Sequence, residues 1–134
     1  MSNSGLLMVT HAPLGSAFLQ VVAHILGATP DLLRVLDIAP NTNREIILDE
    51  GLLLLKQLDD HEGVVILSDC KGSTPGNIAE QLHSIVFNSS LVYGLNLPML
   101  LRALNYCGQS HHAVAAASIT GGKNSIVESG IRHD

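Results

Sequence analysis

Residues 6–15 read Leu-Leu-Met-Val-Thr-His-Ala-Pro-Leu-Gly, an apolar run that ends on a histidine and is followed by a proline. This order predicts a buried strand, a tight loop that holds His11, and a helix from Gly15 to Gly27. In open parallel α/β sheets, ligands and chemistry collect outside the carboxyl ends of the strands. We therefore expect His11 at the functional edge of a sheet, although a loop histidine without function fits the same pattern.

The rest of the chain alternates between the two kinds of element. Apolar or β-branched runs predict strands at residues 32–38, 63–69 and 91–94, and periodic apolar stretches predict helices after each of them. Such alternation implies a parallel sheet with right-handed crossovers. The sequence thus predicts one α/β domain over residues 1–134, with an open, mainly parallel sheet of four strands and helices on both faces.

The C-terminal part has a weaker pattern. Residues 111–118 are expected to be helical, the run Thr120-Gly121-Gly122 to interrupt that helix, and residues 124–131 to form a short helix end or an edge strand. His111 and His112 have no second cluster of ligand residues at metal-binding spacing near them. They are expected to be solvent-facing, and no metal site is predicted.

Composition narrows the class of protein. The 134 residues are 46% hydrophobic and 14% charged, with a formal net charge of −5. Such a chain folds, is expected to bury some apolar surface against a partner, and lacks the basic clusters that nucleic-acid binding needs. Cys70 and Cys107 form no CxxC pair, the N-terminus has no signal-like segment, and no apolar run approaches the roughly 20 residues of a membrane span. A cytoplasmic location is expected.

Asp69 follows the third predicted strand, as His11 follows the first. The carboxyl ends of these strands converge in the predicted sheet, so the two side chains can be neighbours in space. A carboxylate that accepts from one ring nitrogen fixes the tautomer and leaves the other nitrogen free as a nucleophile. Asp69 could instead be an acid that only caps the loop.

The loop after Asp69 resembles an anion site. Thr74 is a candidate N-cap and Pro75 the first helical residue, and the free N–H groups of a helix start favour an anion, here as in the helix after His11. The Thr74 hydroxyl and the N–H groups of the loop would suit a transferred phosphoryl group. The candidate phosphoryl-binding residues are Gly72, Ser73, Thr74 and Gly76. Lys71 would solvate this loop or attract the phosphoryl group.

Two other phosphoryl chemistries fit less well. Cys70 opens a loop before a helix, as in cysteine phosphatases, but position 76 is glycine where those enzymes need an arginine. A receiver domain phosphorylated on Asp69 would need an acidic pair after the first strand to bind Mg²⁺. That strand ends in Thr10 and His11 instead.

Three motifs together resemble a known family. Residues 9–12 (Val-Thr-His-Ala), 68–77 (Ser-Asp-Cys-Lys-Gly-Ser-Thr-Pro-Gly-Asn) and 93–100 (Tyr-Gly-Leu-Asn-Leu-Pro-Met-Leu) look like the IIA component of the mannose-type sugar phosphotransferase system. The match in order and spacing covers most of the chain. It departs from the family at Gly72-Ser73, where a second glycine is common, and at Ala12-Pro13.

The resemblance implies roles for individual residues. His11 would be phosphorylated by the phosphocarrier HPr, Asp69 would orient its ring, and Thr74 would place a hydroxyl beside the phosphoryl group. It also implies a homodimer that exchanges an antiparallel edge strand, for which residues 124–131 are available. No cofactor is implied. Because the chain ends at Asp134 without an attached IIB domain, the acceptor is expected to be a separate IIB-type protein, with membrane contact only through transporter subunits.

The resemblance leaves three functions open. The first is a phosphotransferase component in sugar uptake, which carries the phosphoryl group on His11 from HPr to the IIB-type protein. The second is a regulatory module that signals by its phosphorylation state. The third is a dihydroxyacetone-kinase phosphocarrier, although the run Asn-Leu-Pro-Met at 96–99 favours the sugar type.

Overall fold

The computed structural model of the chain describes residues 3–58 and 63–130. Four parallel strands form one sheet in the order β2-β1-β3-β4. The strands are β1 (Gly5–His11), β2 (Leu33–Ile38), β3 (Val64–Ser68) and β4 (Ser89–Tyr93). The helices are α1 (Leu14–Leu26), α2 (Arg44–Gln57), α3 (Thr74–Ile85), α4 (Leu97–Tyr106) and α5 (His111–Asn124). The predicted α/β class and four-stranded parallel sheet are confirmed.

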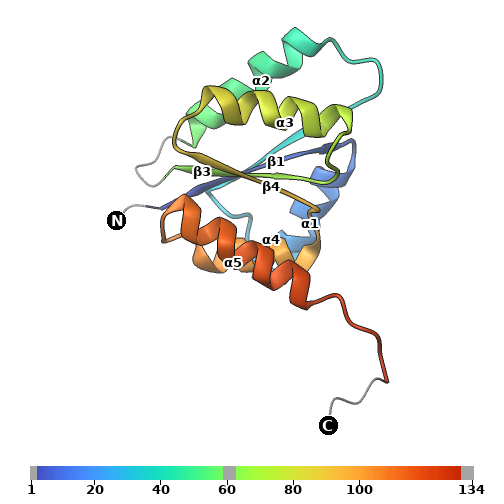
Figure 1. The fold of residues 1–134 in the computed structure, drawn as a ribbon, viewed down its shortest axis with the longest axis vertical. Helices are drawn as coiled ribbons and strands as arrows, with labels where there is room; N and C mark the ends of the chain where they lie inside the picture. Colours follow the sequence, from blue (N-terminus) through green and yellow to red (C-terminus); the bar gives the residue numbers. More distant parts are fainter. Residues whose placement is uncertain (1–2, 59–62, 131–134) are drawn as a thin grey trace.

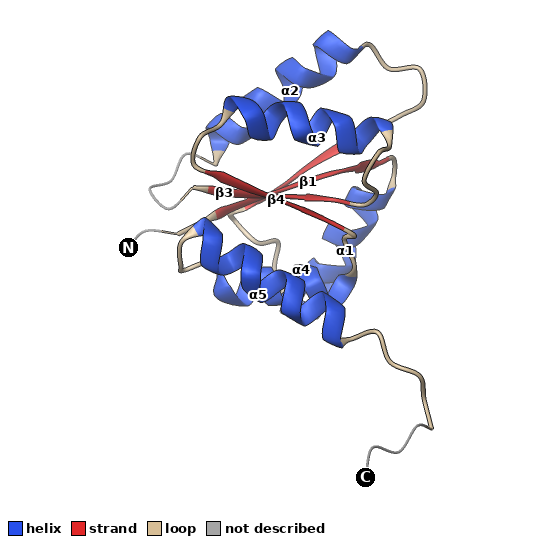
Figure 2. Ribbon diagram, in the orientation of Figure 1, coloured by secondary structure: helices blue, strands red, loops and turns tan. Residues whose placement is uncertain are grey.

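Helices cover both faces of the sheet. Figures 1 and 2 show α2 and α3 on one side, and α1, α4 and α5 on the other. Alternate residues of β1 serve the two layers: Leu6 and Met8 pack in the core under α1, α4 and α5, whereas Leu7 and Val9 pack under α2 and α3. No helix of the described residues is long and apolar enough to cross a membrane.

Chain order sets the position of the candidate site. From β1 the chain moves to β2 on one side, and β3 then adds on the other side of β1. The carboxyl ends of β1 and β3 are therefore a topological switch point, where open α/β sheets leave a crevice. Val9 lies opposite Ser68 in the register, so His11 and Asp69 arrive at the same edge.

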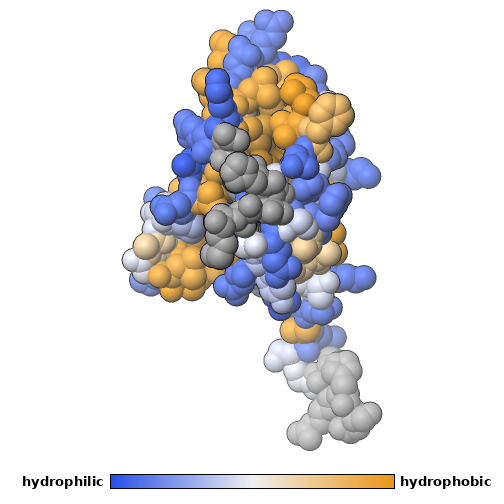
Figure 3. All heavy atoms as spheres, turned by 90° about the vertical axis from the view of Figure 1, so that its left-hand side faces the viewer, coloured by the Kyte–Doolittle hydropathy of each residue, from blue (hydrophilic) through white to orange (hydrophobic). Residues whose placement is uncertain are grey.

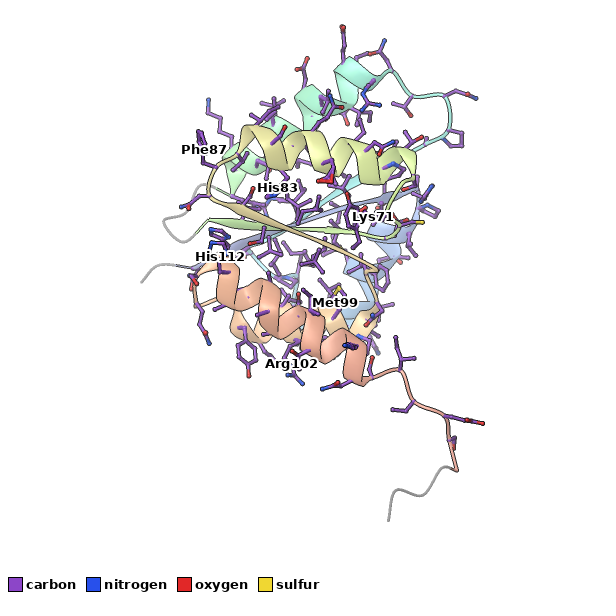
Figure 4. The ribbon with its side chains drawn as sticks, in the orientation of Figure 1. Lys71, His83, Phe87, Met99, Arg102 and His112 are labelled. Carbon is purple, nitrogen blue, oxygen red and sulfur yellow. The ribbon has the colours of Figure 1, made fainter. Side chains whose placement is uncertain are left out.

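The predicted break at Thr120-Gly121-Gly122 is wrong, because α5 continues through these residues to Asn124. The glycines are needed for packing. A Cβ at Gly121 would lie 2.8 Å from the Cβ of Arg102, and one at Gly122 would lie 2.9 Å from the Cβ of Met99. Both partners belong to α4 and lie below the sheet in Figure 4. Glycine thus lets the two helix backbones approach closely.

His111 is also not solvent-facing as predicted. It is 6% exposed, and its Nδ1 lies 2.7 Å from the Oγ of Ser90 on β4. It is buried because α5 begins over the start of the sheet, where a Cβ on Gly63 would lie 2.7 Å from the His111 ring. His112 is exposed as expected. In residues 3–58 and 63–130, no group of three or more histidines, cysteines or acids could hold a metal ion.

After α5 the chain leads away from the body of the protein (Figure 1). Residues 126–130 form neither helix nor strand, so this part of the possible edge strand is not formed in the single chain. Residue 131 lies outside the described residues. The side chains of Ile126 and Val127 are 79% and 80% exposed. Other apolar patches appear in orange in Figure 3, on the face at the left of Figure 1.

We predict that Gly122→Ala destabilises the protein by about 1–3 kcal/mol, because the added methyl group overpacks the contact with α4. The sign is diagnostic, since the same change in an uncrowded helix stabilises by roughly 0.5–1 kcal/mol. Thr120→Ala, at an exposed position of the same helix, is the control and should stay within about 0.5 kcal/mol of the native chain. Equilibrium unfolding in urea measures both. A Gly122→Ala protein as stable as the native chain would contradict the packing argument.

Candidate functional site

The structure brings His11 and Asp69 together. His11 is the last residue of β1, with a side chain 55% exposed, and Asp69 directly follows β3, with a side chain only 8% exposed. The Oδ2 atom of Asp69 lies 2.8 Å from Nδ1 of His11 and accepts the backbone N–H of the same residue at 3.0 Å. One carboxylate oxygen thus holds both the ring and the backbone of His11.

This geometry separates the two ring nitrogens. A neutral imidazole that donates its Nδ1 proton to a carboxylate keeps an unshared electron pair on Nε2. Within the described residues, Nε2 of His11 has no hydrogen-bond partner. The arrangement suits a nucleophile whose orientation is fixed from behind and whose reactive atom is open to a second molecule.

The second carboxylate oxygen of Asp69 differs from the first in its hydrogen bonding. Oδ1 is buried and has no hydrogen-bond partner among the described residues. An unpaired buried carboxylate oxygen is costly, because it has lost water without gaining a donor. Its negative charge can interact strongly with a ring that becomes cationic, since the surroundings are less polar than water.

The loop before α3 has a different cap from the one predicted. Ser73, not Thr74, is the N-cap: its Oγ accepts the N–H of Gly76 at 3.1 Å and donates to the carbonyl of Cys70 at 2.6 Å. Serine and threonine can both cap a helix. The turn at Gly72, where φ is 84°, places Ser73 rather than Thr74 at the N-cap position. Thr74 is the first residue of α3 and is exposed.

A pocket of about 440 Å³ joins these parts. His11 and Ala12 line one side of it, Thr74 and Pro75 another, and residues 38–42 after β2 a third. Thr74 therefore shares a pocket with His11, whereas Gly72, Ser73 and Gly76 do not line it. Lys71 is exposed at the same end of the sheet (Figure 4), which is compatible with both roles predicted for it.

Tyr93 supports the start of α3. Its hydroxyl lies 2.8 Å from an oxygen of Glu80 and 3.3 Å from the carbonyl of Gly76. Burial, a hydrogen bond to Glu80 and the charge of that residue raise the pKa of Tyr93 to about 12. The phenol therefore stays protonated and can donate at any physiological pH.

Sequence reasoning missed a second carboxylate. Asp37 on β2 accepts the backbone N–H groups of Gly15 and Ser16, at 2.9 and 3.0 Å, and the hydroxyls of Thr10 and Ser16. The prediction that the N–H groups at this helix start are free for a phosphoryl group is therefore wrong for Gly15 and Ser16. Asp37 opposes Thr10 in the register, so an acid at the carboxyl end of the next strand was the signal.

These bonds control the charge of Asp37. Burial raises its pKa, but the hydrogen bonds from Ser16, Thr10 and Gly15 outweigh burial and hold the pKa below the ordinary value of 3.8. The carboxylate is thus ionised at neutral pH, as an acid at a helix N-terminus should be.

We predict that Asp37 makes stability depend on pH below about pH 4. Because its pKa is lower in the folded chain, its stabilisation is fully present above 3.8 and is lost as pH falls through the folded value. Unfolding free energies of the native chain and Asp37→Asn, measured in urea from about pH 7 to about pH 2, should differ most at neutral pH and converge in acid. A difference that does not change with pH would contradict this.

Comparisons with known proteins show the family of the chain. A family model described as "PTS system fructose IIA component" matches residues 5–120. The mannose-specific EIIAB component of Escherichia coli (strain K12) is 27% identical over 95 residues, which are 71% of this chain and 29% of that protein. The chain thus spans less than a third of the length of this curated relative.

Two solved structures share the fold. The mannose/sorbose-specific IIA subunit from Enterococcus faecalis superposes with a TM-score of 0.83 at 20% identity, covering 99% of this chain and 98% of that one. A IIA protein associated with the fucose utilization operon of Streptococcus pneumoniae gives 0.82 at 22% identity, covering 95% and 93%. With the family match over residues 5–120, the chain belongs to the mannose-type IIA components of the sugar phosphotransferase system.

Proposed function

We propose that this chain is a phosphocarrier that accepts a phosphoryl group on His11 from phospho-HPr and passes it to a separate IIB-type protein in sugar uptake. The observation that carries the proposal is the 2.8 Å contact between Nδ1 of His11 and Asp69, which leaves Nε2 open beside the pocket. The family of the chain supports the same role.

The proposed reaction has two steps. In the first, the electron pair of Nε2 attacks phosphorus, a nitrogen–phosphorus bond forms, and the bond between phosphorus and the donor breaks with its electron pair left on the donor. In the second, a nucleophile of the acceptor attacks phosphorus and the electron pair returns to Nε2. Asp69 holds the Nδ1 proton in both steps and stabilises the positive charge of the phosphorylated ring. The transfer uses no cofactor.

Thr74 and the loop before it are proposed to receive the phosphoryl oxygens. Thr74 lines the pocket with His11, and its hydroxyl can donate to an oxygen of the transferred group. The loop residues Gly72, Ser73 and Gly76 would act through the shape of the loop, because the Ser73 hydroxyl already accepts a hydrogen bond from the N–H of Gly76. A pocket of about 440 Å³ also leaves room for a side chain of the donor or acceptor.

A homodimer is part of the proposal. β4 is an edge of the sheet and pairs only with β3 among the described strands. The tail after α5 extends from the body and exposes Ile126 and Val127 (Figure 1). An apolar tail and an unpaired edge suit the exchange of a strand between two copies. We place the dimer in the cytoplasm, with membrane contact only through transporter subunits.

Incubation of the full chain with phospho-HPr should attach one acid-labile, base-stable phosphate to His11, because this ring has an open Nε2 beside the pocket. Radiolabelled phosphate and mass spectrometry measure the product. His11→Ala should not be labelled, whereas His24→Ala, which removes an exposed histidine of α1, should be labelled like the native chain. Full labelling of His11→Ala would overturn the proposal.

Addition of candidate IIB-type proteins then tests the second step. Loss of label from the chain and its appearance on a IIB-type protein supports sugar uptake. Label that stays on His11 with every candidate supports a regulatory module instead.

Asp69→Ala should slow transfer to His11 by roughly tenfold or more, because the ring loses the acceptor that fixes its tautomer and orientation. Initial labelling rates measure this, with thermal unfolding to verify that the variant is folded. Asp49→Ala, which removes an exposed carboxylate on α2, is the matched control and should keep the native rate. Equal rates for Asp69→Ala and the native chain would exclude Asp69 from the reaction.

A further inference from the structure

We infer that Asp37 is a positioning residue that holds the turn bearing His11 in its transfer-competent place. The effect on reaction rate rests on the proposed function, whereas the effect on the ring does not. The hydrogen bonds of Asp37 go to Thr10, Gly15 and Ser16 and not to His11. Asp37 acts through the residues on either side of the histidine.

Asp37 binds both ends of the turn. The turn itself is short, since β1 ends at His11 and α1 begins at Leu14. On the side before the histidine, Thr10 donates its hydroxyl to Oδ1 of Asp37 at 2.7 Å. On the side after it, the same oxygen accepts the N–H of Gly15 at 2.9 Å, and Oδ2 accepts from Ser16.

Gly15 makes this close approach possible. A Cβ at that position would lie 2.6 Å from Oγ1 of Thr10 and 2.7 Å from Oδ1 of Asp37. Any larger residue would push the helix start away from the carboxylate. The first turn of α1 has no other side-chain cap, because its N-cap position is Pro13 and makes no such bond. Asp37, on the neighbouring strand β2, thus provides the N-terminal side-chain cap that the residue at the N-cap position does not provide.

Replacement of the carboxylate by an amide would leave the donors to one of its two oxygens without an acceptor and facing an NH2 group instead. Thr10 is completely buried, so no water can replace an acceptor that its hydroxyl loses. The turn would then shift to satisfy these groups and would carry His11 with it. Since Asp69 holds His11 from β3 at 2.8 Å, even a small shift would break the alignment between ring and carboxylate.

The test is Asp37→Asn in the full chain, measured in two ways. The rate of labelling by phospho-HPr at saturation should fall about tenfold, while the donor concentration for half-maximal rate changes less than about twofold. Nitrogen-15 NMR of the His11 ring, assigned from the signals lost in His11→Ala, should show the Nδ1–H tautomer in the native chain and a mixture of tautomers in the variant. A purely structural role would not change the tautomer.

Three further variants sharpen the test. Asp49→Asn makes the same charge change at an exposed site on α2 and should alter neither measurement. Ser110→Ala removes the N-cap of α5 at the other end of the sheet and shows what lost stability alone does. Ser16→Ala removes one donor and leaves the carboxylate in place, so it should show a smaller shift in the same direction even if Asp37→Asn does not fold.

The outcomes separate the two proposals. An unchanged tautomer and rate in Asp37→Asn and Ser16→Ala, or a fall in rate no larger than that of Ser110→Ala, would overturn the positioning role. A native chain that is not labelled by phospho-HPr would overturn the proposed function instead, and the tautomer measurement would still decide the role of Asp37.

Discussion

The parallel pairing of β1 with a neighbour on each side is the constraint on which the site depends. Thr10 opposes Asp37 on β2, and Val9 opposes Ser68 on β3. Because parallel strands end at the same edge, each neighbour delivers an acid to the end of β1. A slip of one residue in either ladder would turn that acid to the other face of the sheet. The buried, two-faced core of β1 therefore fixes the surroundings of His11.

Asp69 and Asp37 are suited to different roles because their hydrogen-bonding surroundings differ. Asp69 keeps one buried oxygen without a hydrogen bond, so its charge is available to the ring of His11. Asp37 has hydrogen bonds to both oxygens, and these hold its pKa below the ordinary value. A carboxylate that is fully bonded to backbone and hydroxyl groups is a structural support. One that is left partly unsatisfied beside a nucleophile is suited to respond to a change in charge.

Structural features could be predicted from the sequence where the signal lies in a short stretch of the chain. The apolar run of β3 and the alternation of elements predict the sheet, and His11 and Asp69 stand out because each ends a strand. Asp37 also lies near a strand end, but its role was missed because the backbone N–H groups that it binds are more than twenty residues away in the sequence. Gly121-Gly122 was misjudged because glycine signals both a helix end and close helix packing. Only the position of α4 separates these two cases.

The exposure of His11 indicates what a partner would have to supply in the proposed transfer. With 55% of its side chain exposed, the ring faces water, which would compete for hydrogen bonds to a phosphoryl group in the proposed transfer. The pocket beside it is lined mostly by apolar or small residues, among them Ala12, Ile38 and Pro75. A partner that covers this pocket would exclude water and strengthen the hold of Asp69 on a cationic ring. In the proposed transfer, this chain would therefore supply His11 and Asp69, and the partner protein would supply the cover that excludes water.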